Sequence, residues 1–298
     1  MDGVTGPGLL LEPEFLGRLE RLTLLSRRLY RSGVRGERRS GTLGRGVEFA
    51  DYRSYQVGDD FRYVDWNIYS RLDRLFVKLF SEEEDINVHL FVDASRSMGW
   101  GHPSKLDYAA RVAAALGYIG LANLDRVGAV AFADRLVRTL PPRRGRAGVL
   151  TLFRFLGGLT PEGRSNLAAA LAEYSLRTRR RGVLVVISDL MFPQGITDGL
   201  RLARYHRFEP FLLHLLADEE LVPALDGDLR LVDSETGAAV EVTADAATAE
   251  AYARARDRYF AEIEQFCLRD QIEYLRGAIS IPFDDLVLRY LRTAGLIA

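Results

Sequence analysis

The chain has 298 residues, of which 48% are hydrophobic and 27% are charged, as in an ordinary soluble globular protein. This length is enough for one large or two modest domains with a sizeable core. Its 40 basic and 41 acidic side chains give a net charge of −1, so no global field attracts nucleic acid or an anionic membrane. The single cysteine, Cys267, excludes an internal disulfide and a multi-cysteine zinc site, and its apolar neighbours at helical spacing indicate a buried structural thiol.

The N-terminal residues lack the features of a secretion signal. Acidic residues stand where a signal peptide carries positive charge, and the apolar run is only three leucines. No stretch approaches the ~20 apolar residues that a membrane-spanning helix needs. We therefore expect a soluble, cytoplasmic protein with no integral membrane segment.

The N-terminal part of the chain predicts one helix and a separate β-rich segment. Residues 14–32 place leucines and a phenylalanine at helical spacing, and Pro13 suits the first turn of that helix. A loop rich in glycine and arginine follows at 32–46. Residues 47–80 are aromatic and strongly charged, which favours short strands and turns, and the acidic run at 81–85 predicts a solvated turn.

From residue 86 the chain alternates between apolar strands and helices. We predict strands at 87–93, 126–133, 183–188 and 210–216, a hairpin partner at 135–140, and helices at about 104–124, 147–157, 165–180 and 196–207. Nearly continuous apolar strands separated by helices indicate a doubly wound, mostly parallel sheet that is covered on both faces. Right-handed crossovers in such a sheet place the strand-to-helix loops at its carboxyl edge.

The C-terminal part predicts a further extension. It contains a hairpin over 229–242 with its turn at 234–237, a long helix over about 245–275 and a short amphipathic helix over 283–292. We therefore divide the chain into an N-terminal helix and β-rich segment, a central α/β domain and a C-terminal extension, at 1–85, 86–218 and 219–298.

Three loops at the predicted carboxyl edge carry carboxylates and hydroxyls. One follows the first strand with the pattern D-x-S-x-S, one precedes a helix, and one follows the strand VLVVIS. The candidate metal ligands are Asp93, Ser95, Ser97, Ser165 and Asp189. Two carboxylates and three hydroxyls form an all-oxygen set suited to Mg²⁺ or Mn²⁺, with water or a partner's carboxylate completing the shell. The alternative interpretation is that these residues are turn formers and helix caps.

The segments DASRSM, GRSNL and VVISDL resemble the three ion-site loops of a von Willebrand factor A domain. The second loop of that family usually offers Thr, and Ser165 keeps the hydroxyl. The resemblance implies a von Willebrand A-like, Rossmann-type fold with a metal ion-dependent adhesion site. In this family the ion does no chemistry, and its open coordination position takes an acidic side chain of a partner.

The segment before the sheet, GRGVEFADYRSYQVGDDFRYVDW, resembles the signature of the bacterial "domain of unknown function 58" family, which carries a von Willebrand A-like domain. The residues that carry the likeness are Gly46, Glu48, Phe49, Arg53, Tyr55, Gly58, Asp59, Asp60, Arg62, Asp65 and Trp66. The resemblance covers roughly residues 44–190. It implies a bacterial protein that works beside AAA+ ATPases of the MoxR type, in protein maturation, complex assembly or envelope stress. Many relatives carry membrane spans before this segment, and none precedes it here.

The same segment contains a charge-balanced cluster beside Trp66. Its members are Arg53, Arg62, Arg71, Asp59, Asp60 and Asp65. The cluster could be a surface that docks a partner, or an acidic switch near the ion. Paired charges interleaved with aromatic residues favour a partly buried Arg–Asp network that attaches the segment to the main domain.

Three functions compete. The first is a non-enzymatic, divalent-cation-dependent protein-interaction module. The second is a Mg²⁺-dependent phosphohydrolase or phosphotransferase, but an aspartyl-phosphate enzyme of the haloacid dehalogenase kind has a second carboxylate where this chain has Ser95. The third, RNA binding, rests on scattered basic loops without interleaved aromatic residues. No Walker-type, G-x-S-x-G or H-E-x-x-H motif occurs, so we predict an adaptor and not an enzyme.

Overall fold

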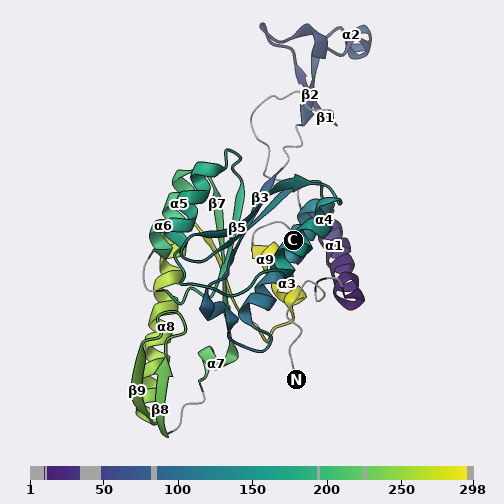
Figure 1. Ribbon diagram of the computed structural model, residues 1–298. Helices are drawn as coiled ribbons and strands as arrows, with labels where there is room; N and C mark the ends of the chain where they lie inside the picture. The colour runs from purple at the N-terminus through teal and green to yellow at the C-terminus, as the bar shows by residue number, and fades with distance from the viewer. Residues whose placement is uncertain are drawn as a thin grey trace. The chain divides into compact units, whose positions relative to one another are not determined.

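The computed structural model describes residues 10, 12–33, 48–81, 86–192, 195–223 and 227–293. The chain divides into two compact units (Figure 1). The larger unit comprises 1–33 and 86–298, and the smaller comprises 34–85. The predicted loop at 32–46 and the turn at 81–85 lie almost wholly outside the described residues.

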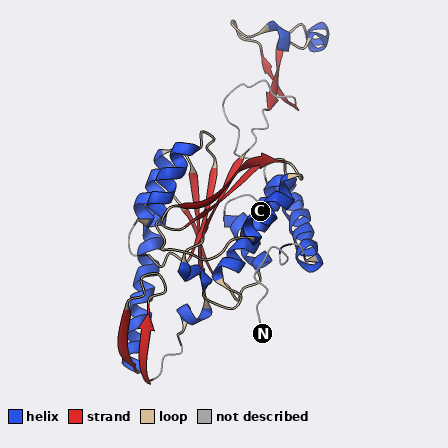
Figure 2. Ribbon diagram, in the orientation of Figure 1, coloured by secondary structure: helices blue, strands red, loops and turns tan. Residues whose placement is uncertain are grey.

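The larger unit contains a six-stranded, mostly parallel sheet, which confirms that prediction (Figure 2). Its strands, in spatial order, are β10 (Glu273–Ala278), β7 (Glu209–Leu216), β6 (Val183–Ser188), β3 (Asn87–Asp93), β4 (Arg126–Phe132) and β5 (Leu136–Arg144). Only β5 pairs antiparallel, with β4. β4 lies on one side of β3, and β6 lies on the other side. The chain therefore moves outward from β3 in both directions, and the direction of the connections reverses at this strand. Sheets of this kind open their ligand crevice at such a point, beyond the carboxyl ends of the strands.

Successive side chains of the central strands enter two separate cores. Leu90 and Val92 of β3 belong to one core, with Val185 and Ile187 of β6. Phe91, between the two β3 residues, belongs to the other. Because both faces are covered, these strands are apolar at consecutive positions instead of at alternate ones.

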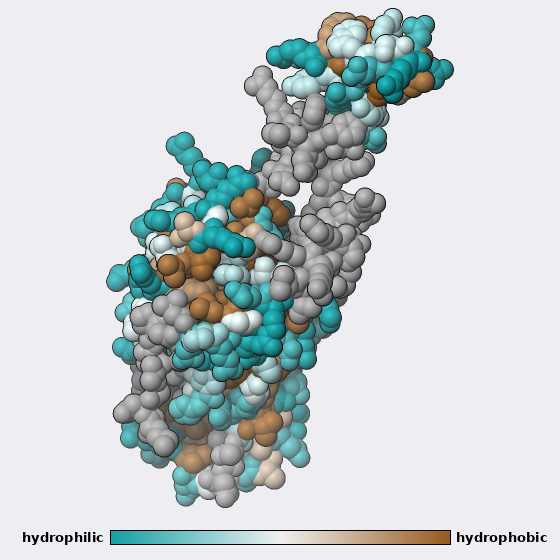
Figure 3. All heavy atoms as spheres, turned by 90° about the vertical axis from the view of Figure 1, so that its right-hand side faces the viewer, coloured by the Kyte–Doolittle hydropathy of each residue, from teal (hydrophilic) through white to brown (hydrophobic). Residues whose placement is uncertain are grey.

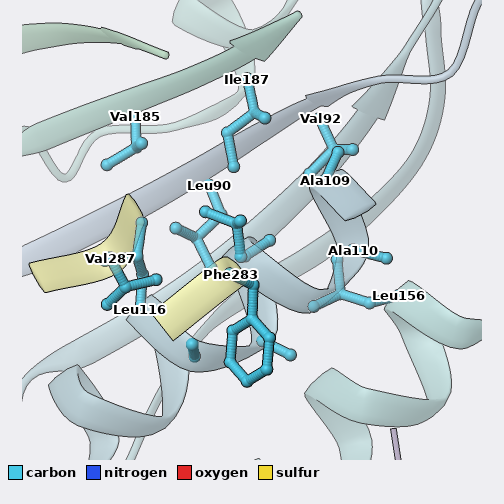
Figure 4. Packing of buried hydrophobic residues seen from close by; sticks show 14 of the residues in the cluster. Leu90, Val92, Ala109, Ala110, Leu116, Leu156, Val185, Ile187, Phe283 and Val287 are labelled. Carbon is cyan, nitrogen blue, oxygen red and sulfur yellow. The ribbon is translucent and has the colours of Figure 1, made fainter. Parts of the chain in front are cut away.

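The first core is covered by helices from both ends of the chain. They are α1 (Pro13–Gly33), α3 (Lys105–Ala122), α4 (Gly148–Gly157) and α9 (Phe283–Thr293). Figure 4 shows Val92 next to the small side chain of Ala109, which lets α3 lie close to the sheet. Gly117 permits a similarly close approach of α4, because a Cβ there would collide with Leu152.

The second core is covered by α5 (Leu167–Arg177), α6 (Ile196–Tyr205) and α8 (Ala246–Arg269). Cys267 of α8 is 1% exposed, and burial raises the pKa of its thiol to about 12, with Asp270 and Glu264 adding to the shift. The predicted buried, unpaired cysteine is therefore confirmed.

The long C-terminal helix was predicted wrongly at its end, and the difference joins the C-terminal residues to the central sheet. The helix predicted to reach about residue 275 ends at Arg269, and Glu273–Ala278 forms strand β10, which pairs parallel with β7. The chain reverses at Gln271, which has a positive φ of +52° and is neither Gly nor Pro, so the sequence carries no turn signal. β10 completes the sheet and α9 enters the first core, so the structure does not set 219–298 apart from 86–218. Nor does it group α1 with the β-rich segment.

The remaining elements of the larger unit are short. They are the 3-10 helix η3 (Arg96–Gly99), helix α7 (Asp218–Leu221) and the predicted hairpin of β8 (Gly227–Val232) and β9 (Ala239–Ala244). None of the helices in the described part of the chain is long and apolar enough to cross a membrane.

The smaller unit consists of the antiparallel pair β1 (Glu48–Ser54) and β2 (Phe76–Ser81), with the 3-10 helix η2 (Phe61–Tyr63) and helix α2 (Trp66–Leu72) between them. Short strands and turns were predicted here and no helix, so α2 was missed, because seven residues are too few to show helical periodicity. Apolar and polar residues are mixed on its surface (Figure 3), and Phe61, Trp66 and Leu72 are more than half exposed.

The charged residues of the predicted cluster pair with near neighbours in the sequence. Arg53 pairs with Asp59 at 2.9 Å and Arg62 pairs with Asp60 at 2.5 Å, both over a few residues of sequence. Asp65 is the buried member. It caps α2 and accepts hydrogen bonds from Lys78 and Tyr52, and the bond from Lys78 contributes most to lowering its pKa to about 2.

Candidate metal centre

Asp93 is the last residue of β3, and its carboxylate is completely buried. The Ser95 backbone N–H donates to its Oδ1 at 2.9 Å, and the hydroxyls of Ser165 and Ser188 donate to its Oδ2 at 2.9 and 2.6 Å. These three donors come from the loop after β3, the loop before α5 and the end of β6. All three are neutral, so none of them cancels the negative charge of the carboxylate.

The D-x-S-x-S loop is held by backbone hydrogen bonds to its neighbours. Ala94 N–H donates to Phe132 O at 2.7 Å, and Ala94 O accepts from Glu162 N–H at the same distance. Ser95 and Ser97 turn their hydroxyls toward each other, with 3.1 Å between the Oγ atoms. Both side chains are buried, so the loop presents two hydroxyls beside Asp93 in a position set by the sheet.

Ser165 is free to face Asp93 because the next residue caps the helix. Asn166 is the N-cap of α5, and its side chain accepts from Ala169 N–H at 3.0 Å. Gly163 has a positive φ of +69°, which turns the loop back toward the sheet. The loop is also tied to the end of β4, since Asn166 N–H donates to Ala133 O at 2.8 Å.

Asp189, which directly follows β6, is completely buried and has a charged partner. Lys105 Nζ donates to its Oδ2 at 2.6 Å and also pairs with Glu220 of α7. Lys105 is the first residue of α3, and its side chain is completely buried too. Glu220 additionally accepts a 2.8 Å hydrogen bond from Ala217 N–H. An ammonium group therefore lies between two carboxylates of this site.

The charges of the site are unequal in number. Burial and, to a smaller extent, the negative charge of Asp189 raise the pKa of Asp93 to about 6, against the lowering effect of hydrogen bonds from Ser188 and Ser95. Burial by itself lowers the pKa of Lys105, but Asp189 and Glu220 outweigh it, so the net shift is upward and the ammonium keeps its proton. The site thus contains three carboxylates and one ammonium, and burying uncompensated charge is costly.

All five predicted ligands lie at the same edge of the sheet. Asp93, Ser95, Ser97 and Ser165 form one hydrogen-bonded group, and Asp189 is close enough for its charge to act on Asp93. In the described ranges no group of three or more His, Cys, Asp or Glu side chains could hold a metal ion. A cation would depend on hydroxyls as well as carboxylates. The oxygen donors and the surplus negative charge fit Mg²⁺ or Mn²⁺.

Four polar residues of this region were not predicted as part of the site, and they are Lys105, Ser188, Glu220 and Glu235. Ser188 carried a signal, since a hydroxyl ends an otherwise apolar strand next to Asp189. The other three carried none, because their partners lie far along the chain.

The sheet order, the two covered faces and the polar carboxyl edge define a mixed α/β protein with a mostly parallel central sheet. The family model described as "Protein of unknown function DUF58" matches residues 51–261, more than half of the chain. The chain belongs to that family, which confirms the resemblance found in its N-terminal signature.

Mycobacterial proteins and two solved bacterial structures are similar to this chain. Uncharacterized proteins of Mycobacterium bovis and Mycobacterium tuberculosis are each 29% identical over 257 residues, covering 85% of this chain and 81% of theirs. BatB from Bacteroides thetaiotaomicron covers 70% of this chain and 98% of its own at 16% identity, with a TM-score of 0.44. An aerotolerance-related membrane protein from Bacteroides fragilis gives the same coverage and TM-score at 18% identity.

Proposed function

We propose that this protein is a non-enzymatic protein-interaction module with a von Willebrand A-like domain that depends on a divalent cation. Mg²⁺ or Mn²⁺ would be held by Asp93, Ser95, Ser97, Ser165 and Asp189. The observation that carries the proposal is the buried Asp93 carboxylate, which among the described residues accepts hydrogen bonds only from a backbone N–H and two hydroxyls, all neutral. A divalent cation would supply the missing positive charge and the oxygen-rich coordination that these groups suit.

The surroundings of the site support recognition of a protein. Trp100 and Met191 follow the first and third of the three candidate metal loops within three residues, and they are 60% and 40% exposed. Exposed apolar side chains beside a charged site are typical of protein interfaces, where aromatic residues and Met are enriched. A partner would bring an acidic side chain to the cation and apolar contacts to this rim.

An enzyme is the less supported alternative. A phosphohydrolase that forms an aspartyl phosphate needs a carboxylate that can approach and attack the phosphorus of its substrate, whereas Asp93 is completely buried. Ser95 also stands where such an enzyme has its second carboxylate. A Mg²⁺-dependent phosphotransferase therefore remains a second candidate without a structural observation of its own.

The partner belongs to the same proposal. The family resemblance implies a MoxR-type AAA+ ATPase, with the protein acting as its adaptor in protein maturation or complex assembly. Because such an ATPase uses ATP, the shared location would be the cytoplasm. Copurification of a MoxR-type ATPase with the wild-type protein in Mg²⁺, but neither in EDTA nor with Asp93→Ala, would support this assignment.

Thermal unfolding with Mg²⁺ or EDTA tests the cation directly. A ligand that binds only the folded state stabilises it, by about 2.7 kcal/mol when its concentration is a hundred times Kd, and so raises the Tm. We expect Mg²⁺ to raise the Tm of the wild type and of the control Asp198→Ala, which removes an exposed acid of α6, but not of Asp93→Ala. A wild-type Tm unmoved by Mg²⁺ and by Mn²⁺ contradicts the proposal. Phosphoester turnover that is lost in Asp93→Ala would favour the enzyme instead.

A further inference from the structure

One face of the long helix α8 carries three hydrogen-bond donors that reach other parts of the fold. Tyr252, Arg256 and Tyr259 lie at the spacing i, i+4 and i+7, which places them in one stripe along the helix. All three side chains are half-buried, whereas the charged residues between them are exposed. The stripe therefore faces the rest of the protein, and each of its donors binds a backbone carbonyl there.

Tyr259 contacts the loop after β6 at a residue whose backbone is strained. The hydroxyl of Tyr259 donates to Leu190 O. Leu190 has a φ of +54°, in the left-handed region that is unfavourable for a residue with a side chain. Its side chain is completely buried in the second core. A conformation of this kind persists only where its surroundings hold it, and the bond from Tyr259 is one of the contacts that do so.

The conformation of Leu190 determines where its two neighbours point. Asp189 precedes it and is a proposed metal ligand, and Met191 follows it and is exposed on the rim of the site. Leu190 N–H donates to Ser188 Oγ at 3.0 Å, and Met191 N–H donates to Asp189 Oδ1 at 3.1 Å. A rotation of the backbone at Leu190 would break both bonds. The strained residue thus couples a proposed ligand to a side chain that a partner could contact.

The other two donors of the stripe hold helix α7. The hydroxyl of Tyr252 donates to Glu220 O at 2.6 Å, and Arg256 Nη1 donates to Leu221 O. The carboxylate of Glu220 pairs with Lys105, the ammonium of the site. A helix of four residues is not stable by itself, so its position depends on contacts with the rest of the fold. Two of these contacts come from α8.

We infer that Tyr259 and Tyr252 are positioning residues, through which α8 orients the Asp189 loop and holds the Glu220 carboxylate beside Lys105. The inference rests on the proposed function, because it concerns the same site. Both hydroxyls keep their protons and can donate. Burial raises the pKa of each, and the charge of Asp189 adds to the shift at Tyr259, as that of Glu220 does at Tyr252.

Removing single hydroxyls tests the inference without metal. Tyr259→Phe and Tyr252→Phe keep their rings, and the matched control is Tyr174→Phe. Tyr174 is also buried in the second core, but its hydroxyl bonds to His89 Nδ1 of β3 at 2.8 Å instead of to a loop of the site. In EDTA, amide hydrogen exchange should be about ten-fold faster at 189–192 in Tyr259→Phe and at 218–222 in Tyr252→Phe, because each variant loses a bond that opposes local opening. Tyr174→Phe should leave both segments as in the wild type.

The affinity for the cation tests whether this positioning matters to the site. Removing a group that orients a metal ligand typically weakens metal binding by about ten-fold or more. Calorimetric titration of the full chain with MgCl₂ should therefore give a Kd about ten-fold weaker for Tyr259→Phe and unchanged for Tyr174→Phe. Wild-type exchange and a wild-type Kd in Tyr259→Phe would overturn the inference. Equal losses in Tyr259→Phe and Tyr174→Phe would overturn it too, since they would reflect a general loss of stability.

Failure of the inference is distinct from failure of the proposed function. If Mg²⁺ binds the wild type but not Asp93→Ala, while Tyr259→Phe keeps the wild-type Kd, the inference fails and the proposed function stands. If neither Mg²⁺ nor Mn²⁺ binds the wild type, both fail. Thermal unfolding in EDTA shows which variants fold. Tyr252→Phe gives the same comparison at α7, so a folding defect in Tyr259→Phe would not hide the answer.

Discussion

The Asp93 end of β3 and the Asp189 end of β6 bury equivalent carboxylates and stabilise them in opposite ways. Both side chains are 0% exposed. Asp93 accepts from hydroxyls and a backbone N–H, all neutral, whereas Asp189 accepts from the Lys105 ammonium at 2.6 Å. Consequently the pKa of Asp93 is raised to about 6 by burial and by the charge of Asp189.

Under the proposed function, this difference separates a charge that the fold itself compensates from a charge that a cation would compensate. A buried ion pair made by two side chains of the fold is permanent, since both partners fold together. A buried carboxylate with only neutral donors can be neutralised by a proton or by a cation from solution. We therefore regard Asp189 and Lys105 as the fixed half of the site, and Asp93 as the half that responds to a ligand. Four predictions follow from this division, from the largest expected effect to the smallest.

Replacing Lys105 should have the largest effect on stability. Lys105→Met leaves Asp189 and Glu220 buried without their cation, and removing one partner of a buried pair typically costs about 3–5 kcal/mol. Urea unfolding in EDTA measures the loss. The double variant Lys105→Met/Asp189→Asn restores part of the charge balance and should lose less. A loss below about 1 kcal/mol for the single variant would show that the pair is not the fixed half of the site.

The two aspartates should respond differently to the same conservative change. In EDTA, Asp189→Asn breaks an ion pair and should cost about 2 kcal/mol, because Glu220 still compensates Lys105. Asp93→Asn removes an uncompensated buried charge at nearly constant shape, so its free energy of unfolding should stay within about 1 kcal/mol of the wild type. Equal losses in urea unfolding would contradict the comparison.

The affinity for Mg²⁺ should fall in acid because the cation and a proton compete for Asp93. The folded-state pKa of about 6 lies above the ordinary 3.8 of aspartate, so the folded protein takes up a proton as the pH falls through 6. Metal ligands must be deprotonated, so Kd should weaken about ten-fold from pH 7.5 to 5. Without metal, acid has the opposite effect on stability. Between pH 6 and 3.8 the folded protein binds a proton at Asp93 that the unfolded chain does not, so this group makes the fold more stable as the pH falls. Calorimetry at both pH values measures the first effect, and a Kd independent of pH would assign the ion elsewhere.

A smaller loss of stability than at Lys105 is expected at Ser188. Ser188→Ala removes the 2.6 Å hydrogen bond to Asp93 and the acceptor of Leu190 N–H, which should cost about 1–2 kcal/mol. Ser175→Ala is a matched control, because Ser175 is also buried but its hydroxyl has no hydrogen-bond partner among the described residues. Its free energy of unfolding should change by less than about 0.5 kcal/mol. Equal effects in the two variants would mean that Ser188 does not support Asp93.

Most of the sheet could be predicted because its signals are local. Each central strand is a short apolar run covered on both faces, and Asp93 and Asp189 stand where two of these runs end. Strand β10 could not be predicted, because Gln271 takes a left-handed conformation that nothing in its own sequence demands. That conformation is maintained by pairing with β7 and by the burial of Ile272, both of which depend on the rest of the fold.

The same distinction applies to the candidate site. The spacing D-x-S-x-S and the positions of Ser165 and Asp189 after or before regular elements are local features, and they were sufficient to propose all five ligands. The ion pairs of Lys105 and the contact of Glu235 join residues 70 to 115 positions apart. Whether a lysine or a glutamate on a polar stretch points to solvent or into a site depends on what folds against it. The type of donor could therefore be read from the residues in order, whereas the balance of charge around Asp93 emerged only when distant segments met at the carboxyl edge of the sheet.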